Sequence, residues 1–152
     1  MLAFGLQATL LLKALSYDAN ITRFSEIRVA VVYSGREDED VADGFIEGFG
    51  GLKNKKVKDI PISATKVKMG SALSGYQVIY IASSKTNIVR KVLPDNSGVI
   101  SATPYPDMVS SGIALGLGEK DGSPKIWVNL DASADAGCKF SSDFLRLAEV
   151  VD

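Results

Sequence analysis

The chain has one residue that could act as a strong nucleophile, Cys138, and it is the only cysteine in the sequence. It lies shortly before a predicted helix and beside Lys139, and both features can lower the pKa of a thiol. Lone cysteines more often pack as small hydrophobic side chains. We therefore interpret Cys138 as a packing residue. A disulfide to another chain is the alternative if the thiol is exposed in an oxidising compartment.

The sequence contains no histidine among its 152 residues. Ser-His and Cys-His nucleophile pairs are therefore excluded, as are histidine-ligated metal sites. One cysteine cannot form an internal disulfide or a multi-cysteine zinc site. An enzyme would have to use carboxylates such as Asp107 or Asp131, and no facing pair can be placed from the sequence. We predict a protein that is not an enzyme and that holds no cofactor and no metal.

Small polar residues follow three predicted strands, where open α/β sheets often bind ligands. They are Ser34, Ser83 and Thr103, and Tyr105 comes two positions after the last of them. We predict that these four residues form a ligand-binding or partner-binding loop region, with rigid turns as the alternative. Ser34 also begins an S-x-x-E spacing typical of a capping box. The carboxylates at positions 37–40 would repel a phosphate there.

Charge gives no sign of a nucleic-acid partner. Seventeen basic residues nearly cancel eighteen acidic ones, which leaves a net charge of −1. The lysines between positions 53 and 58 have no interleaved aromatic residues, so we interpret them as a solvated connector. We expect no nucleic-acid binding.

Hydrophobic periodicity predicts an alternation of strands and helices, followed by a hairpin. The fold class is α/β: one domain over residues 1–152, with a mixed, mostly parallel sheet, helices on both faces, a C-terminal β-hairpin and a closing helix. The hairpin turns at Asp121-Gly122, and the closing helix starts at Ser141 or Ser142, with positions 144, 147, 148 and 151 on its apolar face. Trp127 is expected in the core. The remaining predicted elements are helices over 3–16, 37–49 and 86–93 and strands over 26–34, 57–62, 76–83, 98–103, 111–120 and 124–130.

The first sixteen residues are apolar enough to suggest a signal peptide, but they lack its positively charged start. Their apolar residues share one helical face, so we predict the first helix of the folded domain. Any signal peptide is expected to have been removed upstream. No apolar run reaches the ~18–20 residues of a membrane span, so we expect a chain that is not inserted in a membrane.

The segment "GVISATPYPDMVSSGIALGLGEKDGSPKIWVNLDASADAGCKFSSDFLRLAEVVD" resembles the C-terminal half of the YfiR family, also called the DUF4154 domain. The shared pattern is a strand with a threonine near its end, a glycine-bearing hairpin, a lysine-aromatic strand that ends in Asn-Leu, an Ala-Gly step and Ser-Ser before a Leu-rich helix. The opening "LLLKALSYDANI" and "EIRVAVVY" also resemble the family's first helix and strand. The signature residues are Thr103, Gly112, Lys125, Trp127, Asn129, Leu130, Ala136, Gly137, Ser141, Ser142, Leu145, Leu147 and Ala148.

This resemblance implies a periplasmic, non-enzymatic regulator. It implies a membrane signalling protein as the partner, such as a diguanylate cyclase whose output of cyclic di-GMP is lowered, and it implies a homodimer. Family members that use disulfides for redox control have more cysteines than this chain. The alternative hypothesis is a periplasmic small-ligand-binding protein that resembles one lobe of a solute-binding protein, with its ligand at the strand ends.

Overall fold

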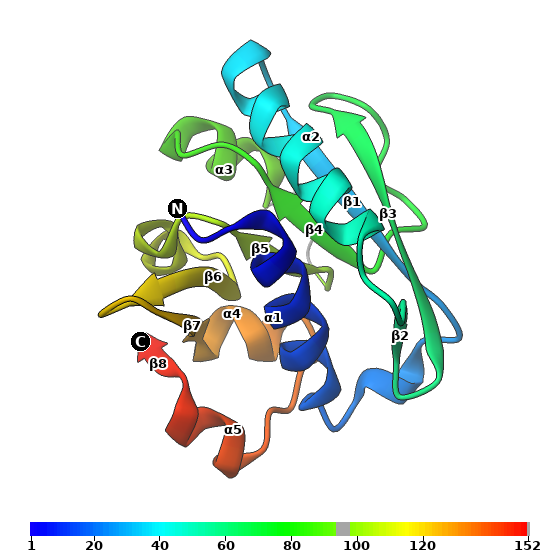
Figure 1. The fold of residues 1–152 in the computed structure, drawn as a ribbon, viewed down its shortest axis with the longest axis vertical. Helices are drawn as coiled ribbons and strands as arrows, with labels where there is room; N and C mark the ends of the chain where they lie inside the picture. Colours follow the sequence, from blue (N-terminus) through cyan, green and yellow to red (C-terminus); the bar gives the residue numbers. More distant parts are fainter. Residues whose placement is uncertain (94–97, 152) are drawn as a thin grey trace.

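The computed structural model describes residues 1–93 and 98–151, and these residues build a twisted mixed sheet covered by helices (Figure 1). The strand order is β2-β3-β1-β4-β5-β6-β7-β8. Neighbouring strands are parallel except for the pairs β2–β3 and β6–β7. The strands are β1 (Ile27–Tyr33), β2 (Lys56–Val57), β3 (Ile60–Lys68), β4 (Val78–Ile81), β5 (Ile100–Thr103), β6 (Leu115–Lys120), β7 (Ser123–Asn129) and β8 (Glu149–Val151).

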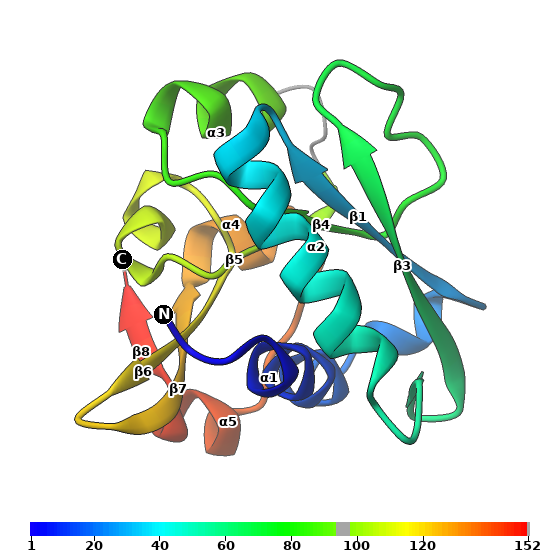
Figure 2. The same ribbon diagram turned by 45° about the horizontal axis from the view of Figure 1, so that its top comes forward.

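The helices lie on both faces of this sheet, so the predicted fold class is confirmed. The α-helices are α1 (Phe4–Ser16), α2 (Arg36–Gly50), α3 (Thr86–Val92), α4 (Leu130–Asp135) and α5 (Ser142–Leu147), with short 3-10 turns η1 (Ile21–Arg23) and η3 (Pro106–Ser111). Figure 2 shows α1 and α2 in front of the sheet, with α3 set apart from them.

Alternate side chains of the central strands enter two separate cores, because successive side chains of a strand point to opposite faces. In β1, Val29 and Val31 belong to the core beneath α1 and α2, whereas Ala30 and Val32 belong to the core beneath α3. Strand β4 divides its side chains in the same way. This double burial explains why the two strands are continuously apolar in the sequence.

The first helix belongs to the folded domain, as predicted. Ala8, Leu11 and Leu15 are fully buried in α1. The helix also buries Gln7, whose side-chain amide donates to the Leu2 carbonyl oxygen at 2.8 Å. The Tyr80 hydroxyl donates to the Gln7 Oε1 at 2.5 Å, and this bond links α1 to the centre of the sheet.

Helices α1 and α2 approach each other closely at two glycines. A Cβ atom at Gly48 would lie 2.6 Å from the backbone carbonyl carbon of Phe4, and one at Gly44 would overlap the Phe4 ring. Backbone cannot move aside as a flexible side chain can. Gly48 is therefore the position that sets the separation of the two helices.

The C-terminal segment differs from the prediction of one long closing helix. Helix α5 ends at Leu147, and Glu149–Val151 form strand β8 parallel to β7. Phe144 is buried, but Leu147 is 61% exposed, so the two do not share one buried face. The open edge of β7 offers backbone hydrogen bonds to Val150 and its neighbours, and this tertiary pairing overrides the helical spacing.

Four smaller predictions are also corrected. The predicted strand over 57–62 is a β2–β3 hairpin, whose Lys58 and Asp59 both have positive φ. The strand predicted over 111–120 begins only at Leu115, after η3. The capping box at Ser34 is wrong because Gly35 occupies the N-cap of α2. Trp127 is half-buried and lies across the glycines of β6, near Pro106, instead of lying in the core.

Candidate functional site at the carboxyl end of the sheet

The four predicted site residues gather at one end of the sheet because β1, β4 and β5 run parallel. Ser34 follows β1, Ser83 follows β4 and Thr103 ends β5. Strand β1 connects through α2 to β3 on one side, whereas β4 connects through α3 to β5 on the other. The carboxyl ends of β1 and β4 thus form the topological switch point at which open α/β sheets tend to bind ligands.

The hydroxyl groups at this switch point are already used in local hydrogen bonds. The Ser83 hydroxyl oxygen accepts from the Lys85 backbone N–H at 3.1 Å, and both lie in the loop before α3. The Thr103 hydroxyl oxygen accepts from the Tyr105 backbone N–H at 3.0 Å. Ser83 and Thr103 are fully buried. These bonds stabilise turns, and a ligand-binding role for the four residues stays a prediction.

Ser34 and Tyr105 lie beside the first turn of α2. The Ser34 hydroxyl donates to the Asp38 carboxylate at 2.6 Å. Burial raises the pKa of the Tyr105 phenol, and the nearby Asp38 carboxylate raises it further. Tyr105 is therefore a neutral hydrogen-bond donor at physiological pH. Ser34 and Tyr105 together can bind a neutral polar group. The acidic residues at the start of α2 disfavour the binding of an anion at this position.

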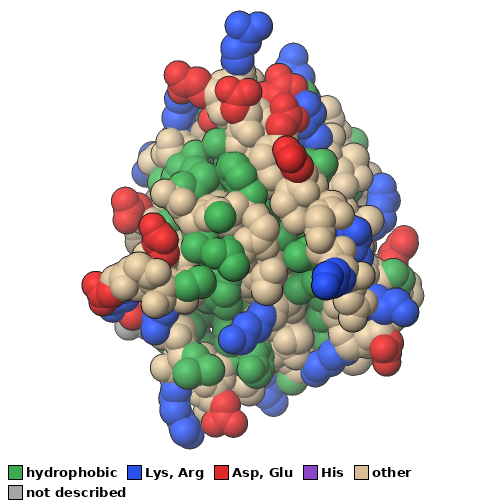
Figure 3. Space-filling model, viewed as in Figure 1, with side chains coloured by type: hydrophobic (Ala, Val, Ile, Leu, Met, Phe, Trp, Pro, Cys, Tyr) green, Lys and Arg blue, Asp and Glu red, His purple; other side chains and the backbone are tan. Residues whose placement is uncertain are grey.

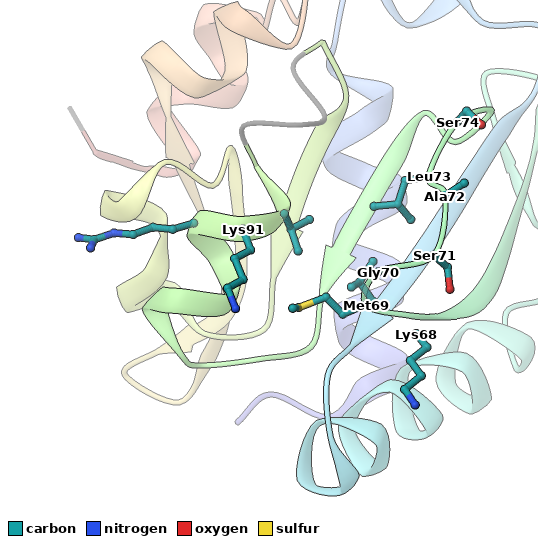
Figure 4. Close-up of a pocket in the computed structure, with 11 residues that line it drawn as sticks. Lys68, Met69, Gly70, Ser71, Ala72, Leu73, Ser74 and Lys91 are labelled. Carbon is teal, nitrogen blue, oxygen red and sulfur yellow. The ribbon is translucent and has the colours of Figure 1, made fainter.

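A groove lies beside the switch point, and no motif in the sequence indicated it. It has a volume of about 810 Å³ and is bordered by the segment 68–74 after β3 and by the last turn of α3 (Figure 4). Basic and apolar side chains line it, and three of the lining residues, Lys68, Arg90 and Lys91, are basic. The two borders are separated by β4 in the sequence, so neither segment alone predicts the groove.

The family-signature residues have structural roles. The Asn129 side chain caps α4 by accepting from the Ala132 N–H, and its amide donates to the Val109 carbonyl at 2.9 Å. Ser141 caps α5 through its hydroxyl oxygen, and Ser142 is the first residue of that helix. Leu145 packs against the core beneath α1 and α2. Gly137, another signature residue, has a φ of +85° and lies near the Arg23 guanidinium.

Cys138 is half-buried and packs against the core beneath α1. Burial raises the pKa of its thiol to about 12, with the Asp18 carboxylate as the next cause. Asp18 is fully buried, and it accepts from the Arg23 guanidinium at 3.0 Å and from the Lys139 N–H at 2.8 Å. These features agree with the interpretation of Cys138 as a packing residue.

A second exposed feature is an apolar surface at the junction of α1, β7 and α5. We call it the Leu147 surface and define it by the residues around a hollow of about 70 Å³. These residues are Leu10, Lys13, Pro124, Lys125, Ile126, Phe144, Leu147 and Ala148. Leu6, one turn before Leu10 in α1, is 47% exposed. Figure 3 shows hydrophobic atoms in a broken band along this face of the molecule.

The described residues contain no group of three or more histidine, cysteine, aspartate or glutamate residues placed to hold a metal ion. Within residues 1–93 and 98–151, no helix has both the length and the apolar character that a membrane crossing needs.

Comparisons with known proteins identify the same family that the sequence resembles. The model of the family described as "DUF4154: YfiR/HmsC-like" matches residues 20–149. None of the curated proteins matches the chain. A solved structure from Streptococcus pneumonia, described as the ABC domain in complex with L-Trp, is similar in fold, with a TM-score of 0.61 and 10% sequence identity. The similarity covers 95% of this chain and 62% of that one.

Proposed function

We propose that this chain, which belongs to the YfiR/HmsC-like (DUF4154) family, is a periplasmic regulator that lowers cyclic di-GMP signalling. It does so by binding the periplasmic part of a membrane-bound diguanylate cyclase and restraining it, without catalysing a reaction itself. The family match over residues 20–149 is the observation that supports this proposal. We also propose that residues 1–152 form one domain.

We place the contact with the membrane protein on the Leu147 surface. Leu147 is 61% exposed, and an exposed leucine beside a hydrophobic hollow is typical of an apolar interface centre. Lys13 and Lys125 lie at the same hollow and supply a polar rim. Stable protein interfaces combine an apolar centre with such a rim, and the apolar centre supplies most of the affinity.

The test is affinity capture of the tagged chain from detergent-solubilised membranes of its own host, followed by mass spectrometry. We expect a protein that combines a membrane span with a cyclase domain. Leu147→Asp should abolish the capture. Leu130→Asp should retain it, because Leu130 is a partly exposed leucine on α4, outside the Leu147 surface. Capture that is equal for both variants would refute the placement of the contact.

A measurement in cells tests the regulatory effect. Removing the gene should raise cyclic di-GMP, and the wild-type chain and Leu130→Asp should lower it again, whereas Leu147→Asp should not. Unchanged cyclic di-GMP after removal of the gene would refute the regulator proposal. We also propose a homodimer, which analytical ultracentrifugation tests. If Leu147→Asp gives monomers but leaves capture intact, the Leu147 surface is the dimer contact instead.

A further inference from the structure

We propose that the groove between segment 68–74 and α3 binds a small organic anion that carries an apolar body. This proposal rests on the geometry and charge of the groove and is independent of the regulator proposal. The groove lies at the carboxyl ends of β1 and β3. It is beside the predicted site residues Ser34, Ser83 and Thr103, but none of these three lines it.

The groove exists because the crossover from β3 to β4 contains no helix. Residues 69–77 cross the face of the sheet as a loop, and Met69, Leu73 and Tyr76 from this loop pack on the core beneath α3. A loop covers less of the sheet than a helix would. Gly70, with a φ of +98°, turns the chain at the end of β3, and no atom lies within 4 Å of where its Cβ would be. The space beside this turn is therefore open.

The charge of the groove favours an anion. Lys68, Arg90 and Lys91 line it, and among the described lining residues none is acidic. Within residues 1–93 and 98–151, none of these three cations forms a salt bridge, whereas Lys66, two positions before Lys68, contacts the carboxylates of Glu39 and Asp43. The three cations are thus available to a ligand in a chain whose overall charge is −1.

The groove is also partly apolar, which argues for a ligand with an apolar body. Val32, Met69, Leu73 and Val92 line it. Figure 4 shows Met69 and Leu73 extending from the loop towards α3, which carries Lys91. The hydroxyl groups of Ser71 and Ser74, which also line the groove, can add hydrogen bonds.

The size of the groove favours a small molecule over a protein segment. Its volume of about 810 Å³ falls within the ~300–1,000 Å³ of small-molecule sites. A ligand of this class would place its anionic group at the cationic border and its apolar body against Met69 and Leu73.

The probe for the test is 1-anilinonaphthalene-8-sulfonate, an organic anion with an apolar body, titrated into the full chain and followed by its fluorescence. We expect one saturable site. The double variant Lys68→Gln/Lys91→Gln should raise the Kd of the probe about tenfold, because it removes two cationic partners of the sulfonate. The control variant Lys53→Gln/Lys56→Gln makes the same charge change in the basic connector and should bind as the wild type does.

Two further measurements establish location and charge preference. Amide cross-peaks of Gly70, Ser71 and Ser74 should shift in ¹H–¹⁵N spectra on addition of the probe. The uncharged analogue N-phenyl-1-naphthylamine should bind more weakly than the sulfonate. The proposal is overturned if the probe does not bind, if its affinity is the same in both double variants, if the shifts lie elsewhere, or if the uncharged analogue binds as tightly.

Discussion

Cys138 should react with thiol reagents much more slowly in the folded protein than in the unfolded chain. Its pKa is raised to about 12 by burial and by the Asp18 carboxylate. An ordinary thiol has a pKa of about 8.5. At pH 8 the thiolate fraction therefore falls from about one quarter to about one in ten thousand, a factor of roughly 2,000.

The raised pKa also makes each thiolate a better nucleophile, and this effect opposes the first. A Brønsted coefficient of about 0.45 increases the reactivity of the thiolate by roughly 40-fold for this difference in pKa. The two effects together leave the folded protein about 50-fold slower than the unfolded chain at pH 8. Restricted access to a half-buried sulfur slows the reaction further.

The assay is the release of thionitrobenzoate from 5,5′-dithiobis(2-nitrobenzoate), measured in buffer and in concentrated urea. Because the chain contains one cysteine, the signal reports Cys138 alone. Between pH 7 and 10 the rate in the folded protein should rise about tenfold with each step of one in pH, whereas the rate in urea should level off above about pH 9. Folded and unfolded rates within threefold of each other, or a plateau near pH 9 in the folded protein, would refute this reasoning.

Three substitutions test the packing, each by the free energy of unfolding in urea. Gly48→Ala should destabilise the protein by about 2 kcal/mol, because overpacking against the α1 backbone costs up to about 3 kcal/mol and helix propensity returns about 1 kcal/mol. Gly50→Ala, at the end of the same helix with nothing within 4 Å, should be neutral or stabilising, and equal effects would contradict the helix-contact argument. Tyr80→Phe should lower the free energy of unfolding by about 1–3 kcal/mol, because the side-chain oxygen of buried Gln7 loses its hydrogen-bond donor. An unchanged free energy of unfolding would contradict this and would show that water replaces the hydroxyl. Asp18→Asn should cost about 3 kcal/mol, because Asp18 is fully buried and the change breaks its part-buried ion pair with Arg23. Asp143→Asn, at an 84% exposed carboxylate, should change stability by under about 0.5 kcal/mol.

The parts of the fold that are predictable from the sequence are those in which local pattern and tertiary environment agree. The continuous apolar runs of β1 and β4 indicate strands buried on both faces, and both strands lie between two cores. The Asp121-Gly122 hairpin is confirmed because both residues adopt the positive φ that a tight turn needs. The short turn at Lys58-Asp59 also has positive φ at both residues but lacks the glycine signal.

Strand β8 could not be predicted because its cause is not local. The residues after Leu147 have helical spacing, and only the presence of the β7 edge converts Glu149–Val151 into a strand. Gln7 is a second case. A glutamine on the apolar face of α1 gives no sequence signal of burial until the Tyr80 hydroxyl is placed opposite its side-chain oxygen.

The candidate site divides in the same way between the predictable and the unpredictable. The rule that parallel strands end together correctly places Ser34, Ser83 and Thr103 at one edge. Each of these hydroxyl groups forms a hydrogen bond with a residue two or four positions away. The sequence alone does not show whether a hydroxyl group at a strand end bonds to its own turn or to a ligand. The groove, by contrast, depends on the lack of a helix between β3 and β4. Lys68 and Lys91, which both line it, come from segments that β4 separates in the sequence. In this fold the groove thus lies where the regular strand–helix alternation breaks, whereas the hydroxyl groups that end the strands are engaged in their own turns.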